Sequence, residues 1–195
     1  MTQPGKIREK RLTSPRNNMY ACAMHLLDAN KVGALGAMIR DRTEASLRDL
    51  SPSAAAVLSM LHFKPGLTTT EVAEVVGVSQ PTAVRLIDGL ERQALIIRGK
   101  PQGRVTPLTL TETGHAQVRE MQALRLSALD GLLSVLQPDE RRRFVSMLDE
   151  ILAGATTSLA FARTTCRLCE HDLCGPEVCP IGCRAAEIDR KGSER

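Results

Sequence analysis

Aromatic residues are nearly absent from this sequence, which has no Trp, one Tyr and three Phe among 195 residues. Hydrophobic residues still make up 43% and charged residues 25%, the balance of a soluble globular protein. The core must therefore be built from aliphatic side chains, and this composition favours packed helices. The length predicts one domain or a domain with an appendage.

Long apolar runs are missing as well. Residues 1–18 lack the unbroken apolar core of a secretory signal, and nowhere do about 18 apolar residues follow one another, as a membrane span requires. We therefore expect a cytoplasmic protein that does not bind a membrane. In the reducing cytosol, clustered cysteines bind metal or carry out redox chemistry more often than they form persistent disulfides.

Motifs for catalysis are also absent. The sequence shows no Gly-rich phosphate loop, no paired-carboxylate motif and no Ser-His-Asp signature, so we do not expect an enzyme. His62 and His115 have no partners nearby in the sequence. Cys22 and His25 lie one helical turn apart, where a lone Cys and a lone His are more often core and surface residues than ligands.

Helical apolar spacing covers most of the chain. It predicts a helix over residues 19–47, a second helix that starts after Ser51, a long helix broken by Pro138, and a last helix over 138–162. Residues 1–18 carry five basic side chains against one acid and indicate a flexible basic arm.

The segment LTTTEVAEVVGVSQPTAVRLIDGLERQALIIR, which starts at Leu67, predicts two short helices joined by a tight turn. Thr68 and Glu71 have the spacing of a reciprocal capping box. Gly77 falls where the first helix must stop, and Ser79 is expected to cap the second. Small or apolar residues occupy the positions where the two helices must pack, so the segment indicates a helix-turn-helix.

The hydrophobic period changes after this segment. Two β-leaning runs, residues 95–98 and 105–110, are separated by a tip that contains Gly and Pro, which predicts a β-hairpin, or wing. The expected fold is therefore mainly α with a small β-wing: a winged helix-turn-helix DNA-binding domain plus dimerisation helices.

The helix-turn-helix segment, the returning strand of the wing and the motif LTETG at residues 110–114 resemble the MarR family (multiple-antibiotic-resistance regulators), which are bacterial winged-helix transcription factors. The resemblance covers about residues 19–160 and places the domain at 19–162. It implies a homodimer whose first and last helices interlock. Family wings commonly carry Asp-x-Arg at the tip; here Arg104 matches the arginine, whereas Gln102 stands at the aspartate position.

DNA contacts are predicted from the start of the second short helix and from the wing. A recognition helix offers its first turns to base edges, where Arg85 can donate two hydrogen bonds to guanine and Gln80 can pair with adenine. Basic residues of the wing suit phosphate or minor-groove contact. The residues predicted to contact double-stranded DNA are Gln80, Pro81, Thr82, Arg85, Arg98 and Arg104.

Five cysteines crowd into residues 166–183 with the spacing C-x2-C-x4-C-x4-C-x3-C, and His171 lies among them. Closely spaced thiolates of this kind can surround one tetrahedral zinc ion without a large fold. Zinc needs only four of these five thiols and one imidazole, so at least one is spare. We expect Cys183 to be the remainder, and whether Cys183 or His171 is a ligand is left open. The predicted zinc ligands are Cys166, Cys169, Cys174 and Cys179.

The sequence leaves two alternatives to zinc for this cysteine-rich tail, residues 163–184. An iron–sulfur cluster also takes four cysteines, and a Cys-Pro pair, here at Cys179, occurs in cluster-binding proteins. Metal-free redox thiols are a further alternative. A metal here either senses a signal or only orders the carboxyl end. The remaining residues, 185–195, are predicted to be a flexible charged terminus.

These patterns predict a dimeric transcription regulator, a repressor released from a pseudo-palindromic operator by a small molecule, a metal or an oxidant. The alternative is a thiol redox or metal-handling protein in which the helix-turn-helix fold only supports the tail.

Overall fold

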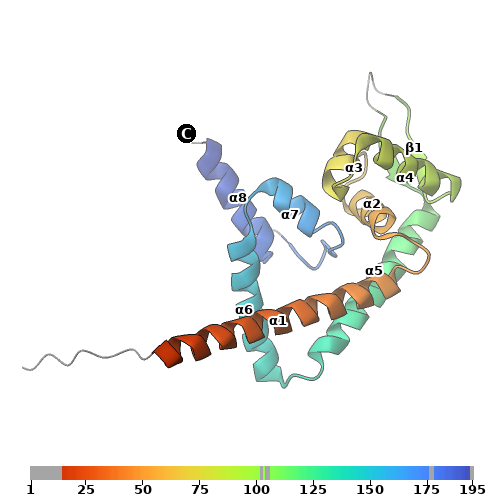
Figure 1. The fold of residues 1–195 in the computed structure, drawn as a ribbon. Helices are drawn as coiled ribbons and strands as arrows, with labels where there is room; N and C mark the ends of the chain where they lie inside the picture. Colours follow the sequence, from red (N-terminus) through yellow and green to blue (C-terminus); the bar gives the residue numbers. More distant parts are fainter. Residues whose placement is uncertain (1–14, 102, 104–105, 176–177, 194–195) are drawn as a thin grey trace, which may run out of the picture. The chain divides into compact units, whose positions relative to one another are not determined.

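The computed structural model describes residues 15–101, 103, 106–175 and 178–193; the side chains of residues 15–24 are outside this description. The described part contains eight helices and one two-stranded antiparallel sheet (Figure 1), which confirms the mainly α fold with a small β-wing. The chain divides into two units, Met1–Asp41 and Arg42–Arg195. No helix in the described part is long and apolar enough to cross a membrane.

Helix α1, Pro15–Ser46, begins before Met19, the predicted start. Residues 15–18 of the predicted flexible arm are therefore helical, and the rest of the arm lies outside the described residues. A proline is tolerated in the first turn because its missing N–H needs no partner there. Several large apolar side chains of α1 are exposed: Leu26, Leu27, Val32, Met38 and Ile39.

Helix α2, Pro52–Phe63, forms the centre of the second unit. Ser51 caps it as predicted, because the Ser51 side chain accepts a hydrogen bond from the Ala54 N–H. Most of its side chains are buried, and α2 packs against α3, α4, α5 and β2. The core is aliphatic, as the composition predicted. Its largest fully buried members include Leu47, Leu58, Leu61, Val72, Ile87, Leu90, Ile96, Leu108, Val118 and Met121.

The helix-turn-helix consists of α3, Thr69–Val76, and α4, Gln80–Arg92. The predicted capping box is present: the Glu71 N–H donates to Thr68 Oγ1 at 3.2 Å, and the Thr68 N–H donates to Glu71 Oε2 at 2.9 Å. Gly77 has a φ of +72°, so the turn needs its left-handed conformation. Ser79 occupies the N-cap position of α4, as predicted, but its side chain makes no capping hydrogen bond.

The wing is shorter than predicted. Strand β1, Ile96–Arg98, pairs antiparallel with β2, Leu108–Leu110, and Leu67 adds an isolated bridge to Leu108. Val105, the predicted start of the second strand, lies outside the described residues. The isolated bridge ties the hairpin to the segment that precedes α3.

The glycine of the LTETG motif, Gly114, lies where α5 packs closely against the wing. Helix α5, Glu112–Leu133, starts against the turn that precedes β1, where the Thr111 hydroxyl donates to the Ala94 carbonyl at 2.7 Å. A Cβ atom at position 114 would lie 2.1 Å from the Leu95 carbonyl oxygen. Only glycine permits this close approach between helix and wing.

The carboxyl-terminal third differs from the prediction in two places. The expected single helix over 138–162 is two helices, α6 (Pro138–Ala155) and α7 (Leu159–Thr165). The chain turns extended at Thr156, and Ser158 caps α7 by accepting a hydrogen bond from the Phe161 N–H at 3.0 Å.

The second difference concerns the predicted flexible terminus, because residues 180–193 form helix α8, Pro180–Ser193. Ile181 and Ala185 are one turn apart and are buried with Ala162 of α7 in a second small core. Helix α8 packs against α6 and α7, beside which it lies in Figure 1. The terminal segment is therefore ordered by apolar burial that the prediction overlooked.

Candidate nucleic-acid interface and thiol pocket

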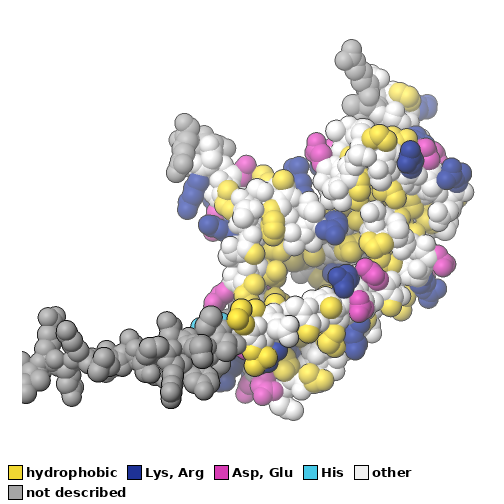
Figure 2. All heavy atoms as spheres, in the orientation of Figure 1, with side chains coloured by type: hydrophobic (Ala, Val, Ile, Leu, Met, Phe, Trp, Pro, Cys, Tyr) yellow, Lys and Arg dark blue, Asp and Glu magenta, His cyan; other side chains and the backbone are white. Residues whose placement is uncertain are grey.

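The start of α4 presents the predicted base-reading residues to solvent. Gln80, Pro81, Thr82 and Arg85 are all exposed, whereas Ala83, Ile87 and Leu90 on the opposite side of the helix are buried. Figure 2 shows Lys and Arg side chains interspersed with Asp and Glu over this region. The apolar stripe thus fixes α4 on the core and leaves a polar face at its first turns.

The predicted contact residues of α4 differ in how they are held. Gln80 Nε2 donates to Thr70 Oγ1 at 3.2 Å, which ties it to α3, and the hydroxyls of Ser79 and Thr82 are 2.9 Å apart. Arg85 makes no hydrogen bond or ion pair with the described residues. Its five N–H donors are therefore available to a ligand such as a base edge.

Arg98 does not extend into solvent as the predicted phosphate contact would. Its guanidinium pairs with Asp88 at 2.6 Å and with Glu91, both on α4, and its side chain is one-third exposed. It therefore fastens the base of the wing to α4, a contact that sequence spacing does not reveal. Arg104 and Gln102, the predicted tip residues, lie outside the described residues.

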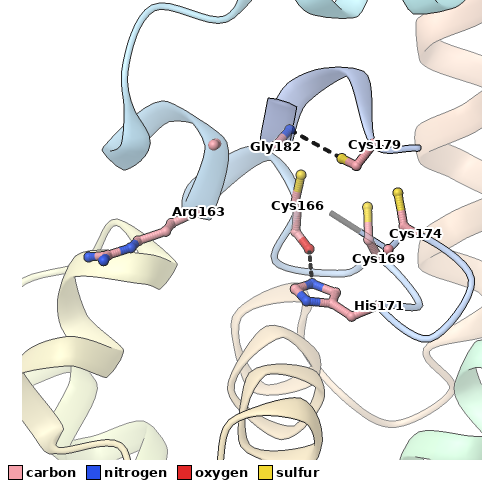
Figure 3. Close-up of a pocket in the computed structure, with 9 residues that line it drawn as sticks. Arg163, Cys166, Cys169, His171, Cys174, Cys179 and Gly182 are labelled. Atoms are coloured by element: carbon pink, nitrogen blue, oxygen red, sulfur yellow. Dashed lines mark hydrogen bonds between the residues drawn. The ribbon is translucent and has the colours of Figure 1, made fainter. Parts of the chain in front are cut away.

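A second candidate site is a pocket between α7 and α8, here called the thiol pocket (Figure 3). All four predicted metal ligands line it, together with His171, and their side chains point toward a common space. None of these four cysteines forms a disulfide. Cys183 lies one turn into α8 and is not among the residues that line the pocket. The four predicted ligands are Cys166, Cys169, Cys174 and Cys179.

Local structure delivers each thiol to the pocket. Cys166 is the C-cap residue of α7. The Cys169 N–H donates a hydrogen bond to the Cys166 carbonyl at 2.9 Å, and this turn brings the Cys169 thiol beside the Cys166 thiol. Cys179 immediately precedes α8, and its Sγ accepts a hydrogen bond from the Gly182 N–H at 3.3 Å. The sulfur thus takes the position of a helix N-cap and pairs with one of the backbone N–H groups that start α8.

The thiols differ in acidity. A hydrogen bond from Cys166 lowers the pKa of Cys169, and the positive charge of Arg125 acts in the same direction. That pairing raises the pKa of Cys166, as does burial. Burial is the main cause that raises the pKa of Cys174. Cys169 is therefore the most readily ionised of these three thiols.

The loop that carries the thiols is fastened to the winged helix by Gln122 of α5. This side chain is 2% exposed, and its Nε2 contacts Ser59 Oγ at 3.1 Å and the Leu168 and Cys169 carbonyls at 3.1 and 3.4 Å. Its Oε1 accepts a hydrogen bond from Arg125. A buried amide joined to a distant loop cannot be predicted from sequence spacing.

Aromatic contacts at the end of α2 fasten the same loop. The His171 ring stacks on Phe63 with centroids 4.8 Å apart, and its Nε2 lies 3.2 Å from the Cys166 carbonyl. His62 and His115, which have no partners nearby in sequence, meet with their Nδ1 atoms 2.9 Å apart. Burial, followed by the charge of His115, lowers the pKa of His62.

Comparison with known proteins bears on the helix-turn-helix part of the chain. Residues 48–104 match the family model of the MarR family. The chain is similar to the YusO protein from Bacillus subtilis, with 26% identity and a TM-score of 0.57, over 74% of this chain and 100% of YusO.

The chain is also similar to the Mycobacterium tuberculosis MarR family protein Rv2887 in two complexes. The complex with DNA gives 25% identity and a TM-score of 0.52, over 63% of this chain and 95% of Rv2887. The complex with salicylic acid gives 27% identity and a TM-score of 0.50, over 62% and 92%. The family match ends at residue 104, so it does not include the thiol pocket.

Proposed function

From the match of residues 48–104 to the MarR family model, we propose that this chain is a MarR-family regulator and acts as a dimeric repressor that leaves a pseudo-palindromic operator when an effector binds. Members of this family are DNA-binding transcription regulators. The dimer, the repression and the effector are the parts that we infer for this chain.

The observation that carries the proposal is the polar face at the start of α4. Arg85 is exposed there and makes no hydrogen bond or ion pair with the described residues, while Ile87 and Leu90 hold the helix on the core. A rigid helix with an uncommitted guanidinium at its first turns suits the major groove, where a guanidinium can donate two hydrogen bonds to guanine. Rv2887, whose fold is similar, forms a complex with DNA, which supports DNA binding by this chain.

Dimerisation is supported by apolar side chains without a covering element. In the first unit, α1 exposes Leu26, Leu27 and Val32; in the second, α6 exposes Met147 and Ile151. Apolar side chains are visible at the surface in Figure 2. Exposed large apolar side chains gathered on one helix are suited to a protein interface. A two-fold dimer would place its half-sites about one helical turn, roughly 34 Å, apart.

The effector is proposed to act by shifting the dimer between two spacings of its recognition helices. A small molecule that binds more tightly to the dimer whose recognition helices do not match the operator stabilises that state. The loss of DNA affinity is limited by the difference between the small molecule's affinities for the two states. The salicylic acid complex of Rv2887 makes salicylate a suitable first probe. A metal or an oxidant that acts at the thiol pocket is the other class of effector that the sequence predicts.

The test is a gel-shift titration with the promoter DNA beside the protein's own gene. Arg85→Ala is expected to weaken specific binding by about 1–3 kcal/mol and to relax one base preference. Arg143→Ala removes an exposed arginine of α6 that makes no hydrogen bond or ion pair with the described residues, and it is the matched control for loss of one positive charge. Binding of Arg85→Ala at the parent affinity would show that α4 does not read bases as proposed.

A second experiment tests the dimer. Sedimentation at micromolar concentration is expected to give the mass of two chains. A monomer would remove the basis for a pseudo-palindromic operator.

The alternative function, a thiol redox or metal-handling protein, is favoured by the four thiols that line one pocket. It predicts thiol–disulfide turnover or metal transfer by a protein without DNA affinity. Specific, salt-sensitive gel shifts would exclude it as the main function, because phosphate contacts make DNA affinity fall as salt rises.

A further inference from the structure

The four thiols of the thiol pocket make pairwise contacts. The Cys166 thiol donates a hydrogen bond to the Cys169 sulfur, and the thiols of Cys174 and Cys179 form a second hydrogen-bonded pair. Sulfur atoms in such contact can reach the length of a disulfide bond, about 2.05 Å, by side-chain rotation, provided that the backbone holds the two residues close together. The pairwise contacts therefore direct attention to thiol–disulfide chemistry.

The backbone holds Cys166 and Cys169 close enough for a disulfide. The Cys169 N–H donates to the Cys166 carbonyl at 2.9 Å, so these residues are the first and fourth positions of a β-turn. The Cα atoms of these two positions lie within about 7 Å of each other, which is the largest separation that a disulfide bridges. Both side chains are half-buried, and Figure 3 shows both sulfur atoms directed into the pocket. Both thiols are reduced in this structure.

The second pair is fixed in a different way. Cys179 is buried, and its Sγ accepts a hydrogen bond from the Gly182 N–H at 3.3 Å at the start of α8. A disulfide at Cys179 would draw this sulfur away from an N–H group that has no partner within the helix. The pair formed by Cys166 and Cys169 is therefore the one that can be oxidised with less disturbance of the fold.

The surroundings of Cys169 suit a reactive thiol. Arg125 lies beside the Cys169 sulfur and is held there by its hydrogen bond to Gln122. A positive charge beside a partly exposed thiol is typical of reactive cysteines, whereas structural cysteines are buried in apolar surroundings. The pocket has a volume of about 370 Å³, which is within the range of small-molecule sites. A small disulfide can therefore enter it and reach Cys169.

From this geometry we propose that Cys166 and Cys169 are a redox-active dithiol that exchanges with low-molecular-weight disulfides. The Cys169 sulfur attacks one sulfur of the reagent, forms a mixed disulfide and releases the first small thiol. The Cys166 sulfur then attacks the Cys169 sulfur, forms the intramolecular disulfide and releases the second small thiol. Two electrons pass to the reagent, and the two cysteine protons end on the two released thiols.

The exchange requires neither DNA nor a dimer, so its test is separate from that of the proposed repressor. The full-length chain is reduced, freed of reductant, treated with bis(2-hydroxyethyl) disulfide and blocked with N-ethylmaleimide. Cleavage after arginine by trypsin and after glutamate by a glutamyl endopeptidase then separates the tail cysteines. The peptides are residues 164–167 with Cys166, 168–170 with Cys169, 171–177 with Cys174, and 178–184 with Cys179 and Cys183.

The expected product is peptide 164–167 joined to peptide 168–170, seen by mass spectrometry and lost after treatment with dithiothreitol. Linkage of 164–167 to 171–177 or to 178–184 in its place overturns the proposed pairing. Recovery of both Cys166 and Cys169 as maleimide adducts after excess reagent overturns the proposal. The mapping uses the parent chain, so it decides the pairing even if a variant loses its fold.

Serine variants test the order of the two steps. Cys166→Ser should stop at the mixed disulfide and keep the hydroxyethylthio group on Cys169, because the second thiol is missing. Cys174→Ser removes a neighbouring thiol of the same pocket and is the matched control, which should form the parent linkage. Loss of this linkage in Cys174→Ser would show that the pair does not act alone, and the proposal would be wrong.

Metal analysis of the purified parent chain tests the competing use of the same thiols. Zinc and iron are measured per chain, with Cys166→Ser and Cys169→Ser in parallel. We expect neither metal to approach one per chain in the parent. A metal content near one per chain that both variants lose would assign the thiols to a metal site and overturn the proposal.

Discussion

Gln122→Met tests whether one buried amide fastens the thiol-bearing loop to the winged helix. Gln122 Nε2 has two hydrogens and contacts three acceptors within 3.4 Å: Ser59 Oγ and the carbonyls of Leu168 and Cys169. Methionine fills nearly the same volume but donates no hydrogen bond, so the change removes the polar contacts without opening a large cavity.

The expected cost follows from the groups that lose their donor. A buried polar group left unsatisfied costs about 1–3 kcal/mol. The Ser59 hydroxyl can rotate to another acceptor, so the Leu168 carbonyl is the main group left unpaired. We therefore expect the free energy of unfolding to fall by about 2 kcal/mol. For a protein of this size, that loss lowers Tm by about 4–8 °C.

Urea unfolding followed by circular dichroism under reducing conditions measures this change, and the rate of Cys169 alkylation reports release of the loop. Gln117→Met on the same helix is the matched control, because Gln117 is half-buried and makes none of these contacts; it should change stability by less than about 0.5 kcal/mol. Parent-like stability and parent-like alkylation of Gln122→Met would refute the fastening role.

Three further changes test other contacts. Gly114→Ala should lower the free energy of unfolding by about 1–3 kcal/mol or more, because its Cβ would lie 2.1 Å from the Leu95 carbonyl oxygen; Gly131→Ala in the open part of α5 should instead be neutral or stabilising, and equal urea midpoints for the two variants would contradict this. Arg98→Ala should leave the salt dependence of DNA binding unchanged, because the carboxylates of Asp88 and Glu91 already neutralise the Arg98 charge. If the slope of log affinity against log salt concentration became smaller by about 1, Arg98 would instead contact a phosphate. Because the pKa of His62 is lowered in the folded state, the unfolded chain takes up a proton more readily below about pH 6.5, so stability should fall between pH 7.5 and 5.5 by more in the parent than in His62→Gln; equal losses in urea titrations would show that His62 is not responsible.

The helix-turn-helix could be predicted because its signals are local. The Thr68 and Glu71 capping box and the left-handed Gly77 act within one turn of the chain, and the structure has both. The four pocket thiols were also found from spacing alone, because they lie within fourteen residues of one another. Local chemistry fixes local geometry, so these features are readable without a structure.

Helix α8 was missed although its sequence carries a usable signal. Ile181, Ala185 and Ile188 have helical spacing, and the first two are buried while the third is half-buried. The charged composition of residues 185–195 favours a flexible terminus, whereas the helical spacing of the apolar residues favours a helix. Here the periodicity was the better guide.

Other contacts had no signal in the sequence. Gln122 meets the Leu168 carbonyl across 46 positions, and His62 meets His115 across 53. The pairing of Arg98 with Asp88 depends on how the wing folds back on α4. Such contacts are set by tertiary packing, which neither hydrophobic period nor capping residues specify.

The thiol pocket is connected by packed helices to α4, the proposed DNA-reading helix. Helix α7, which ends at Cys166, packs against α3, and α3 packs against α4. The loop after α7 is held by Gln122 and by the stack of His171 on Phe63. A group bound in the pocket that orders this loop can therefore affect DNA affinity only by as much as these contacts differ between the loaded and the empty states. Coupling between sites of this kind is typically about 1–3 kcal/mol, or about 5- to 150-fold in affinity. The contacts of Gln122, which are expected to contribute about 2 kcal/mol, fall within that range.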